Sequence, residues 1–453
     1  MIYPSVHAVL RKSGTWSRLG KVTTVFVFLF LLSGGCSSPL HAEDDNILST
    51  FPISGSFRLA GEGDKIGMRT TLLNPSNYLM RPDQHADGFL IGNATLKGLG
   101  GQVESELRLG YGYFAGTDSP SFDKHETYVN INQLYYQTAN GPFSLMFGRK
   151  KVRWGVGYSY SPTDLITQLK NPEDPEDRLN KIKGSDIIQL SYINSNDEVD
   201  LVYYPILNWD SGHHFINANR IGMRWYNLID PFDLAFVGIV DEYNKWSAGV
   251  NSAVTIGKSL ELHAEYLYTS LNNTNYPNPY LDPAEIYSPF FLPHTVKGAN
   301  DLLVGGQATF YGDWNLTLEY IYHGTGYSDD EYHAYVDRLS SLNSMLYTYY
   351  NQMPVMAGLK ETALNFTTPI RQHYVFTRLY HPHLVNSISV EAYSFVGLAD
   401  KSGLFVFMPK YTGSSSYEVY CRLEKFWGKS DSEFGLVPER LSGIVGLSLF
   451  LGK

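Results

Sequence analysis

Beyond its N-terminus, this chain consists of short segments in which apolar and polar residues alternate, and this alternation strongly limits the folds open to it. The segments are rich in Tyr, which occurs 34 times, and turns of Gly, Asn and Asp separate them. A period of two sends successive side chains to opposite faces of a β-strand. Alternating segments of about ten residues, joined by turn residues, are typical of a transmembrane β-barrel. The sequence therefore predicts an all-β fold that crosses a membrane with strands.

The N-terminus has the parts of a secretory signal sequence. Several Lys and Arg precede the apolar run Val22–Leu32, and Leu40-His41-Ala42 forms a small-residue cleavage site. The run is too short for a membrane-spanning helix, which needs about 20 residues. An alternative is cleavage before Cys36 with acylation of that cysteine. We expect a signal peptide at 1–42, a periplasmic segment at 43–54 and a transmembrane β-barrel at 55–453.

Charge and cysteine content exclude several classes of protein. Without residues 1–42 the chain keeps 31 Lys and Arg against 45 Asp and Glu, a net charge near −14. This balance argues against nucleic acid as a partner. Besides Cys36 the chain has only Cys421, so disulfide frameworks, zinc sites and attached haems have no sequence support. We expect no cofactor and no bound metal.

Eighteen segments have the length and alternation of barrel strands. They are 55–73, 88–98, 101–114, 125–138, 143–154, 184–194, 197–206, 218–227, 231–241, 246–257, 259–270, 301–311, 313–324, 370–381, 384–397, 402–412, 415–428 and 441–452. Tight turns alternate with longer links, which predicts an antiparallel barrel with short periplasmic turns and long extracellular loops. Sixteen strands is the alternative, because 55–73 also suits a hairpin or a small inward element.

Tryptophan positions agree with two aromatic belts at the membrane interfaces. Of the six tryptophans after the signal peptide, four fall near expected outer strand ends and two near periplasmic ends. The outer set is Trp154, Trp209, Trp246 and Trp427, and the periplasmic set is Trp225 and Trp314.

Alternation assigns charged side chains to the lumen. Glutamates share a face with other polar residues in three of the segments, and a charge facing lipid at mid-membrane costs several kcal/mol. These lumen glutamates are Glu104, Glu106, Glu261, Glu265 and Glu319. On segment 143–154, Arg149, Lys151 and Arg153 share one face at strand spacing and predict a basic ladder. Arg220 and Arg224 are candidates for the same side.

Two interpretations of these charges remain open. Rows of Arg and Lys in a pore favour anions, and facing carboxylates create a transverse field across a constriction. Alternatively, the charges pair across neighbouring strands and hydrate the wall. Loop 155–183, with three prolines and an acidic run, suits an inward-folded constriction or a solvent-facing flap, while loop 325–369 suits a cap or a short helix.

Histidines do not form a recognisable catalytic or metal-binding pattern. His213 and His214 lie near Asp210, and His323 and His333 lie near acidic residues. Neither group has a specific spacing of nucleophile, base and orienting residue, so we expect no enzymatic activity.

One stretch resembles a family of bacterial outer-membrane barrels. Gly148-Arg149 with Trp154-Gly155, followed by Ser161-Pro162-Thr163-Asp164, resembles the G-R-x-x-x-x-W-G…P-x-D signature of alginate-export-like and related porin-like families. Segments 399–411 and 432–435 are also similar to C-terminal parts of such barrels. The resemblance implies an eighteen-stranded barrel whose basic lumen conducts an anionic polysaccharide, with Arg149, Lys151 and Arg153 on that path. The lumen glutamates depart from this pattern.

Together these features predict a porin-like channel in the outer membrane of a Gram-negative cell. It passes small hydrophilic solutes or ions by diffusion through a charged lumen, contacts outer-membrane lipid, and has a homo-oligomer as one possible state. The alternatives are a gated exporter of an anionic polysaccharide and a non-conducting scaffold for a partner protein.

Overall fold

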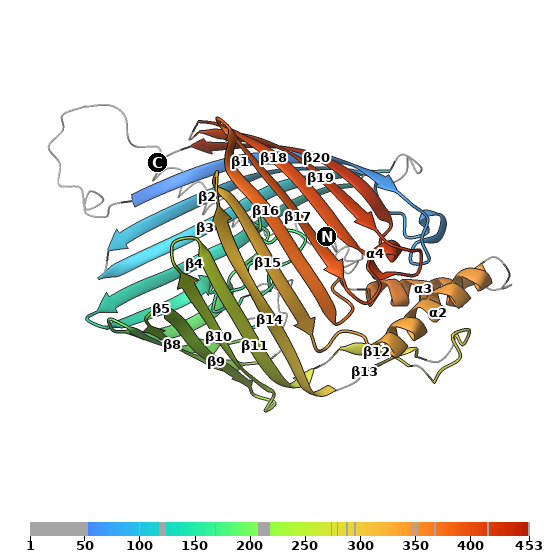
Figure 1. Ribbon diagram of the computed structural model, residues 1–453, viewed down its shortest axis with the longest axis horizontal. Helices are drawn as coiled ribbons and strands as arrows, with labels where there is room; N and C mark the ends of the chain where they lie inside the picture. The colour runs from blue at the N-terminus through green and yellow to red at the C-terminus, as the bar shows by residue number, and fades with distance from the viewer. Residues whose placement is uncertain are drawn as a thin grey trace, which may run out of the picture.

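The computed structural model describes residues 53–98, 100–116, 124–167, 169–206, 218–272, 274–278, 280–286, 289–293, 296–346, 348, 352–366, 368–414 and 416–451. They form a closed antiparallel barrel (Figure 1). The barrel strands are β1 (Ile53–Met68), β2 (Gln84–Gly98), β3 (Gly101–Ala115), β4 (Lys124–Asn140), β5 (Phe143–Lys150), β6 (Ser185–Ile193), β7 (Asp197–Tyr204), β8 (Arg220–Ile229), β9 (Phe232–Asp241), β10 (Trp246–Ile256), β11 (Leu260–Asn272), β14 (Val296–Phe310), β15 (Trp314–His323), β16 (His373–Val385), β17 (Ile388–Gly397), β18 (Gly403–Ser414), β19 (Tyr417–Trp427) and β20 (Glu439–Leu451).

Neighbouring strands along the chain pair with each other, and β20 pairs with β1 to close the sheet. The eighteen-stranded antiparallel barrel is therefore confirmed, and the sixteen-stranded alternative is wrong because β1 pairs on both sides. Closure removes the free edges that a membrane would not tolerate. The predicted signal peptide 1–42, with Cys36, lies outside the described residues, as do residues 43–52. The first strand begins at Ile53, two residues before the predicted boundary.

The two ends of the barrel differ as predicted. Tight turns join the strands at the periplasmic end, on the left of Figure 1, and the longer connections lie at the extracellular end. These connections contain a short helix η3 (Pro75–Asn77), a small hairpin of β12 (Asn275–Pro277) and β13 (Phe291–Pro293), and the helices α2 (Asp329–Leu346), α3 (Gln352–Leu364) and α4 (Glu433–Leu436). None of the helices in the described part of the chain has the length and hydropathy needed to span a membrane.

The predicted loop 325–369 carries the helical pair α2 and α3. Ser328 starts α2 with a reciprocal capping box, in which its backbone N–H donates to the Glu331 carboxylate at 2.7 Å and its hydroxyl oxygen accepts from the Glu331 N–H at 3.4 Å. Tyr335 and Leu342 on α2 are fully buried in an apolar cluster that includes α3 and the extracellular ends of the barrel strands. Asn343 donates to the backbone oxygen of Leu72, in the link from β1 to β2. The helical pair is thus fixed to loops from several strands.

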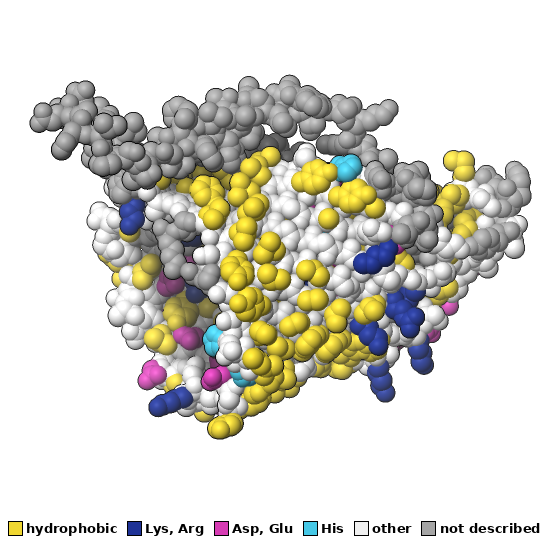
Figure 2. Space-filling view, turned by 90° about the horizontal axis from the view of Figure 1, so that it is seen from above, with side chains coloured by type: hydrophobic (Ala, Val, Ile, Leu, Met, Phe, Trp, Pro, Cys, Tyr) yellow, Lys and Arg dark blue, Asp and Glu magenta, His cyan; other side chains and the backbone are white. Residues whose placement is uncertain are grey.

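Alternation separates the outer and inner faces of the wall. On β20, Val445 and Leu447 are exposed outward, whereas Ile444 and Ser448 are buried inward. Figure 2 shows the resulting band of apolar side chains on the outside of the barrel. Trp225 and Trp246 are exposed near strand ends, as the aromatic belts require. Trp209 lies outside the described residues.

Two sequence-based expectations for 143–154 are wrong. Strand β5 ends at Lys150, four residues earlier than predicted, and residues 151–184, which we call the inner loop, leave the wall there. Trp154 is only 3% exposed, so it does not belong to an interfacial belt. It packs with Ile166 of the same loop against lumen-facing residues of β4–β9. This apolar contact fills the β4–β9 side of the lumen.

Candidate functional site

The inner loop begins with a turn organised by Asp164. The Asp164 Oδ1 atom accepts hydrogen bonds from the backbone N–H groups of Trp154 at 2.7 Å and Gly155 at 2.9 Å. Arg153 Nη1 lies 2.9 Å from Asp164 Oδ2. The predicted lumen cation Arg153 thus forms an ion pair within the loop, and its carboxylate partner is completely buried.

Glu265, on β11, attaches this loop to the barrel wall. Its Oε1 atom accepts from the backbone N–H groups of Val156 at 2.6 Å and Gly157 at 2.5 Å. Its Oε2 atom accepts from the Thr163 N–H at 3.0 Å and the Thr163 hydroxyl at 2.7 Å. The Ser161 hydroxyl is within 3.1 Å of both oxygens. The side chain is 1% exposed, so this carboxylate serves as an anchor for the loop and not as a water-facing charge.

Glycine is required where the loop passes the anchor. A Cβ atom added to Gly155 would lie 1.6 Å from Ser161 Oγ, and one added to Gly157 would lie 2.0 Å from the Tyr160 carbonyl oxygen. Real Cβ atoms do not approach other heavy atoms so closely. The Gly-Val-Gly spacing therefore allows the backbone to approach Glu265.

Glu319, on β15, provides a second anchor. It accepts from the backbone N–H groups of Tyr158 at 2.6 Å and Ser159 at 2.8 Å, and also from the Ser159 hydroxyl. His263 Nε2 lies 2.9 Å from the same carboxylate. Since Glu265 and Glu319 come from neighbouring parts of the wall, the segment 156–163 is held against one side of the barrel.

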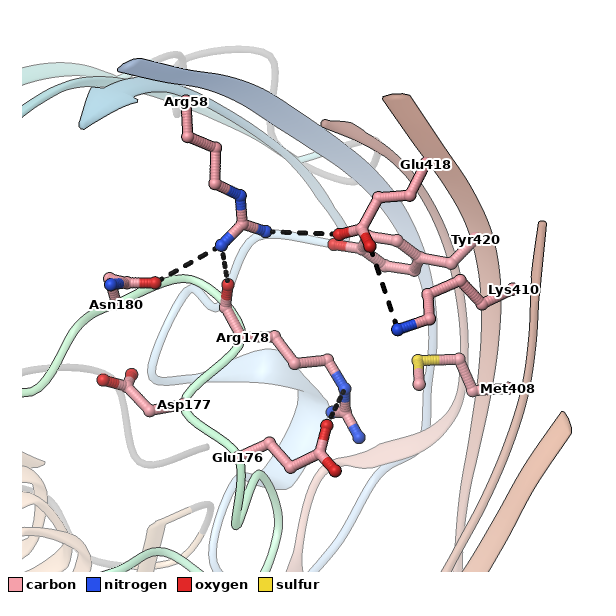
Figure 3. Close-up of a pocket in the computed structure, with 9 residues that line it drawn as sticks. All are labelled: Arg58, Glu176, Asp177, Arg178, Asn180, Met408, Lys410, Glu418 and Tyr420. Carbon is pink, nitrogen blue, oxygen red and sulfur yellow. Dashed lines mark hydrogen bonds and ion pairs between the residues drawn. The ribbon is translucent and has the colours of Figure 1, made fainter. Parts of the chain in front are cut away.

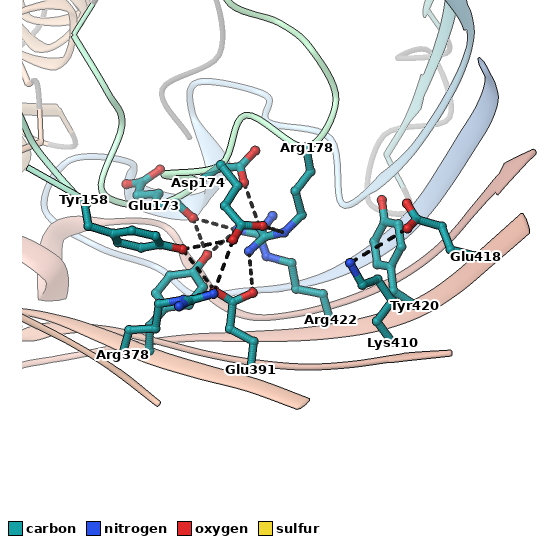
Figure 4. Close-up of polar contacts among 12 residues, drawn as sticks. Tyr158, Glu173, Asp174, Arg178, Arg378, Glu391, Lys410, Glu418, Tyr420 and Arg422 are labelled. Atoms are coloured by element: carbon teal, nitrogen blue, oxygen red, sulfur yellow. Dashed lines mark hydrogen bonds and ion pairs between the residues drawn. The ribbon is translucent and has the colours of Figure 1, made fainter. Parts of the chain in front are cut away.

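The later part of the inner loop reaches β16, β17 and β19 (Figure 4). Glu391 on β17 lies between two arginines: Arg378 Nε is 2.6 Å from its Oε1 atom, and Arg178 Nη2 of the loop is 3.1 Å from its Oε2 atom. Arg422 on β19 donates to the backbone oxygen of Glu173 at 2.8 Å. Buried charges are tolerated when paired and hydrogen-bonded in this way. Charged side chains of the wall therefore hold the inner loop in two places, at residues 156–163 and at residues 173–178.

Ionisable groups within the loop respond to this burial. Burial lowers the pKa of Lys170, whose ammonium group donates to the Gly157 carbonyl at 2.6 Å. Burial also raises the pKa of Asp177. This effect outweighs the hydrogen bonds from the backbone N–H groups of Ile182 and Lys181, which lower the pKa. Both shifts follow from the burial of these side chains in the inner loop.

A charged cavity of about 200 Å³ remains between the inner loop and the wall formed by β1, β18 and β19 (Figure 3). Its lining residues are Arg58, Glu176, Asp177, Arg178, Asn180, Met408, Lys410, Glu418 and Tyr420. Arg58 on β1 donates to the backbone oxygen of Arg178 at 2.9 Å, and its Nη2 atom lies 3.6 Å from Glu418. Lys410 Nζ is 3.8 Å from the other Glu418 oxygen. Cations and carboxylates thus face one another around this space.

The predicted basic ladder does not exist as one row. Arg149 lies in the same column of β5 as the outward Phe147, and its guanidinium forms two bonds to Asp186, at 2.9 and 2.7 Å. Lys151 follows the end of the strand and pairs with Glu106 at 2.9 Å. With Arg153 in the turn described above, the three cations point to three different carboxylates. The strand prediction failed because the chain leaves the wall at Lys150.

The other predicted lumen charges occupy inward positions, but they do not meet in one place. Arg220 and Arg224 lie on the inward face of β8, and Arg224 Nη1 is 3.2 Å from Asp200. Glu104, on β3, accepts a hydrogen bond from the Tyr135 hydroxyl. Glu261 lies 3.7 Å from His263 Nδ1 on β11. None of the predicted lumen residues is among those that line the cavity: Glu265 and Glu319 anchor the inner loop, and the others lie on other parts of the wall.

Several charged residues around the cavity and on the adjoining wall were not among those predicted from the sequence. These are Arg58, Arg178, Arg378, Glu391, Lys410, Glu418 and Arg422. All except Arg178 occupy inward positions on segments predicted as strands, so the same alternation would have found them. Arg178 has no such signal, because it belongs to the inner loop.

Histidines and acidic residues do not form a metal site in the described part of the chain. His323 Nδ1 lies 3.0 Å from Asp301, and His333 is on α2. His213 and His214 lie outside the described residues.

Comparison with solved structures identifies proteins of the same fold. OccK11 of Pseudomonas aeruginosa matches over 88% of this chain and 96% of its own, with a TM-score of 0.50 and 9% identity. OccAB1 of Acinetobacter baumannii matches over the same shares, with a TM-score of 0.52 and 10% identity. The chain has the porin fold. This fold and the outward apolar band locate the protein in the bacterial outer membrane.

At this level of identity the likeness to porins concerns the fold alone. No family model matches the chain, and no curated protein matches its sequence. The resemblance to alginate-export-like barrels therefore stays a prediction.

Proposed function

We propose that the protein is a passive channel through which small hydrophilic solutes or ions cross the outer membrane, without a cofactor and without enzymatic chemistry. One observation carries the proposal: the inner loop is anchored to the wall at Glu265 and Glu319, and a charged cavity remains between this loop and β1, β18 and β19. A loop held inside a barrel narrows the lumen. The polar lining of the remaining space suits hydrated solutes.

The equal numbers of cations and carboxylates in the cavity lining support a channel with only a weak preference between cations and anions. Three cations in the lining face three carboxylates. Opposite charges across a constriction orient dipolar solutes but cancel most of the long-range field. A conduit for an anionic polymer would need an excess of cations along its length. The predicted ladder does not supply one, because each of its cations is paired with a carboxylate.

Conductance in a planar bilayer tests the proposal. The mature protein should give steady ohmic currents, and a salt gradient should give a reversal potential close to zero. Lys410→Gln should shift this potential toward cation preference, and Glu418→Gln should shift it toward anion preference, because the two residues carry opposite charges on the cavity wall. Arg224→Gln, on the opposite side of the lumen, is the matched control and should leave the potential nearly unchanged.

Two outcomes would contradict the proposal. A folded barrel that passes no current would favour a scaffold or a gated exporter. Equal potentials in the Lys410 and Glu418 variants would remove this cavity from the conduction path.

A further inference from the structure

Five of the eight exposed cations in the described part of the chain gather at one end of the barrel. The exposed Lys and Arg side chains of the described residues are Lys65, Lys97, Lys258, Lys360, Lys401, Lys425, Lys429 and Arg440. Lys97 and Lys258 lie at the periplasmic end, and Lys360 lies on α3. The other five lie at the extracellular ends of β1 and β18–β20. Figure 2 shows Lys and Arg side chains gathered in this way at the right of the wall, beyond its apolar band.

Strand pairing brings these cations together. Lys425 on β19 lies opposite Leu441, the residue after Arg440 on β20. Trp427 pairs with Gly403, and the two chains stay adjacent beyond the strands, because a Cβ atom on Gly428 would lie 2.6 Å from the Ser402 Cβ atom. Lys429 and Lys401 therefore continue the same two neighbouring chains. Adjacent strands are about 4.8 Å apart, so the cluster occupies a compact area.

The outward column of β19 gives the depth of this cluster in the membrane. It reads Tyr417, Val419, Cys421, Leu423, Lys425 and Trp427 from the periplasmic to the extracellular end. A strand rises about 3.3 Å per residue and is tilted by about 40° from the membrane normal. Projected on that normal, the stretch from Tyr417 to Trp427 measures about 25 Å, the height of the apolar band of an outer-membrane barrel. Aromatic residues at both ends mark the two interfaces. Lys425 therefore lies about 5 Å inside the outer interface, and its long side chain can extend to the outer-leaflet headgroups.

Nearby carboxylates leave this cluster with a net positive charge. Asp83 pairs with Lys65 at 2.5 Å, and Glu439 pairs with Arg81 at 2.6 Å. Asp400 accepts from the Ser402 hydroxyl and the Glu433 N–H. Within the described residues, the exposed carboxylate that remains at this rim is Asp431.

Arg69, next to the cluster, adds further positive charge. Its guanidinium donates to the backbone oxygens of Val437, at 3.0 Å, and Phe434, at 2.5 Å, and so does not depend on a carboxylate there. Burial and the nearby Arg440 lower the pKa of Arg69. Two arginines side by side repel each other unless an anion lies between them.

We propose that Lys401, Lys425, Lys429 and Arg440 form a binding site for the phosphate groups of a phosphorylated glycolipid in the outer leaflet. Lys425 lies in the outward column of β19, and the other three cations are exposed at the extracellular ends of the neighbouring strands, next to the outward apolar surface. Basic clusters at this depth attract anionic headgroups. A bound lipid would then contact β18, β19 and β20 together at the extracellular rim, from outside the barrel and without entering the lumen.

Binding of a bisphosphorylated lipid A tests the proposal on the full-length mature protein. The protein, in neutral detergent with EDTA to remove bridging divalent cations, is titrated with lipid A and with the same lipid after removal of its phosphates. Native mass spectrometry counts the lipid bound at each concentration. We expect the phosphorylated form to bind at least tenfold more tightly, with a preference that weakens as salt is added.

Matched variants locate the site. The triple variant K425Q/K429Q/R440Q should lose the preference for the phosphorylated lipid. The control K97Q/K258Q/K360Q, which removes the same number of charges elsewhere, should keep it. A preference that persists in the first variant, or one that is equally lost in the control, would overturn the assignment. If the first variant fails to fold, equal binding of the two lipids by the unaltered protein would be enough to reject the site.

Discussion

Replacing Glu265 with Gln should loosen the inner loop inside an intact barrel. The carboxylate accepts hydrogen bonds on both oxygens, from Val156 and Gly157 on one and from Thr163 on the other. A glutamine keeps one acceptor oxygen but presents an NH₂ group at the second position. There it would meet the Thr163 N–H, and two donors would face each other.

The size of the effect follows from the bonds that are lost. A hydrogen bond to a charged group contributes about 1.5–3 kcal/mol. The Thr163 hydroxyl can turn to accept from the new NH₂ group, whereas the Thr163 N–H cannot. Loss of that one bond weakens the attachment by about 1.5–3 kcal/mol, which corresponds to a factor of about 10 to 10² in the population of the detached loop. Glu319 and Asp164 continue to hold their parts of the loop, so we expect partial and reversible detachment.

Single-channel recording in a planar bilayer measures this detachment. The Glu265→Gln protein should show frequent transitions to a larger conductance and more current noise than the unaltered protein, while its strands stay intact by circular dichroism. Glu261→Gln is the matched control, because Glu261 lies on the same strand, also faces inward, and is 46% exposed. If Glu265→Gln and the double variant with Glu319→Gln both keep the original conductance and noise, the inner loop does not set the width of the pore.

Further predictions concern the loop and the extracellular end. Gly157→Ala should displace the loop, because the new Cβ atom would meet the Tyr160 carbonyl oxygen at 2.0 Å; a change in mean conductance would show it, and unchanged currents would contradict it. Leu342→Ala should cost about 2–5 kcal/mol in local stability of the helical pair, seen as faster hydrogen exchange in α3 with unchanged exchange in the barrel. Burial raises the pKa of Glu433 to about 7, so its protonated form is favoured in the folded state. The stability of the surrounding loops should then be highest below pH 4.5 and fall by about 3 kcal/mol up to pH 7; hydrogen exchange of α4 should show this dependence, and Glu433→Gln should abolish it.

The strand plan of this barrel could be predicted because it depends on local patterns. In the segment that became β20, alternation of Val445 and Leu447 with Gly446 and Ser448 assigned each side chain to a face, and the structure agrees. The prediction failed at β5, where residues 151–154 continue the alternation but leave the wall. Their departure depends on Asp164 and on apolar contacts of Trp154 inside the lumen, and neither affects the local pattern.

The sequence by itself determined the order and facing of most strands, because a period of two and the turn residues act over a few neighbouring positions. The pairing of β1 on both sides decided between eighteen and sixteen strands. Only the tertiary structure decided the path of the inner loop and the partners of the charges. Glu265 and the loop residues that it holds are about a hundred positions apart in the chain, as the bond from Val156 shows. Such contacts require the closed barrel, since closure brings β11, β15 and β17 around one lumen. The alternation predicts that Glu265 faces inward. The closed barrel determines that its carboxylate accepts hydrogen bonds from backbone N–H groups of the inner loop instead of from water.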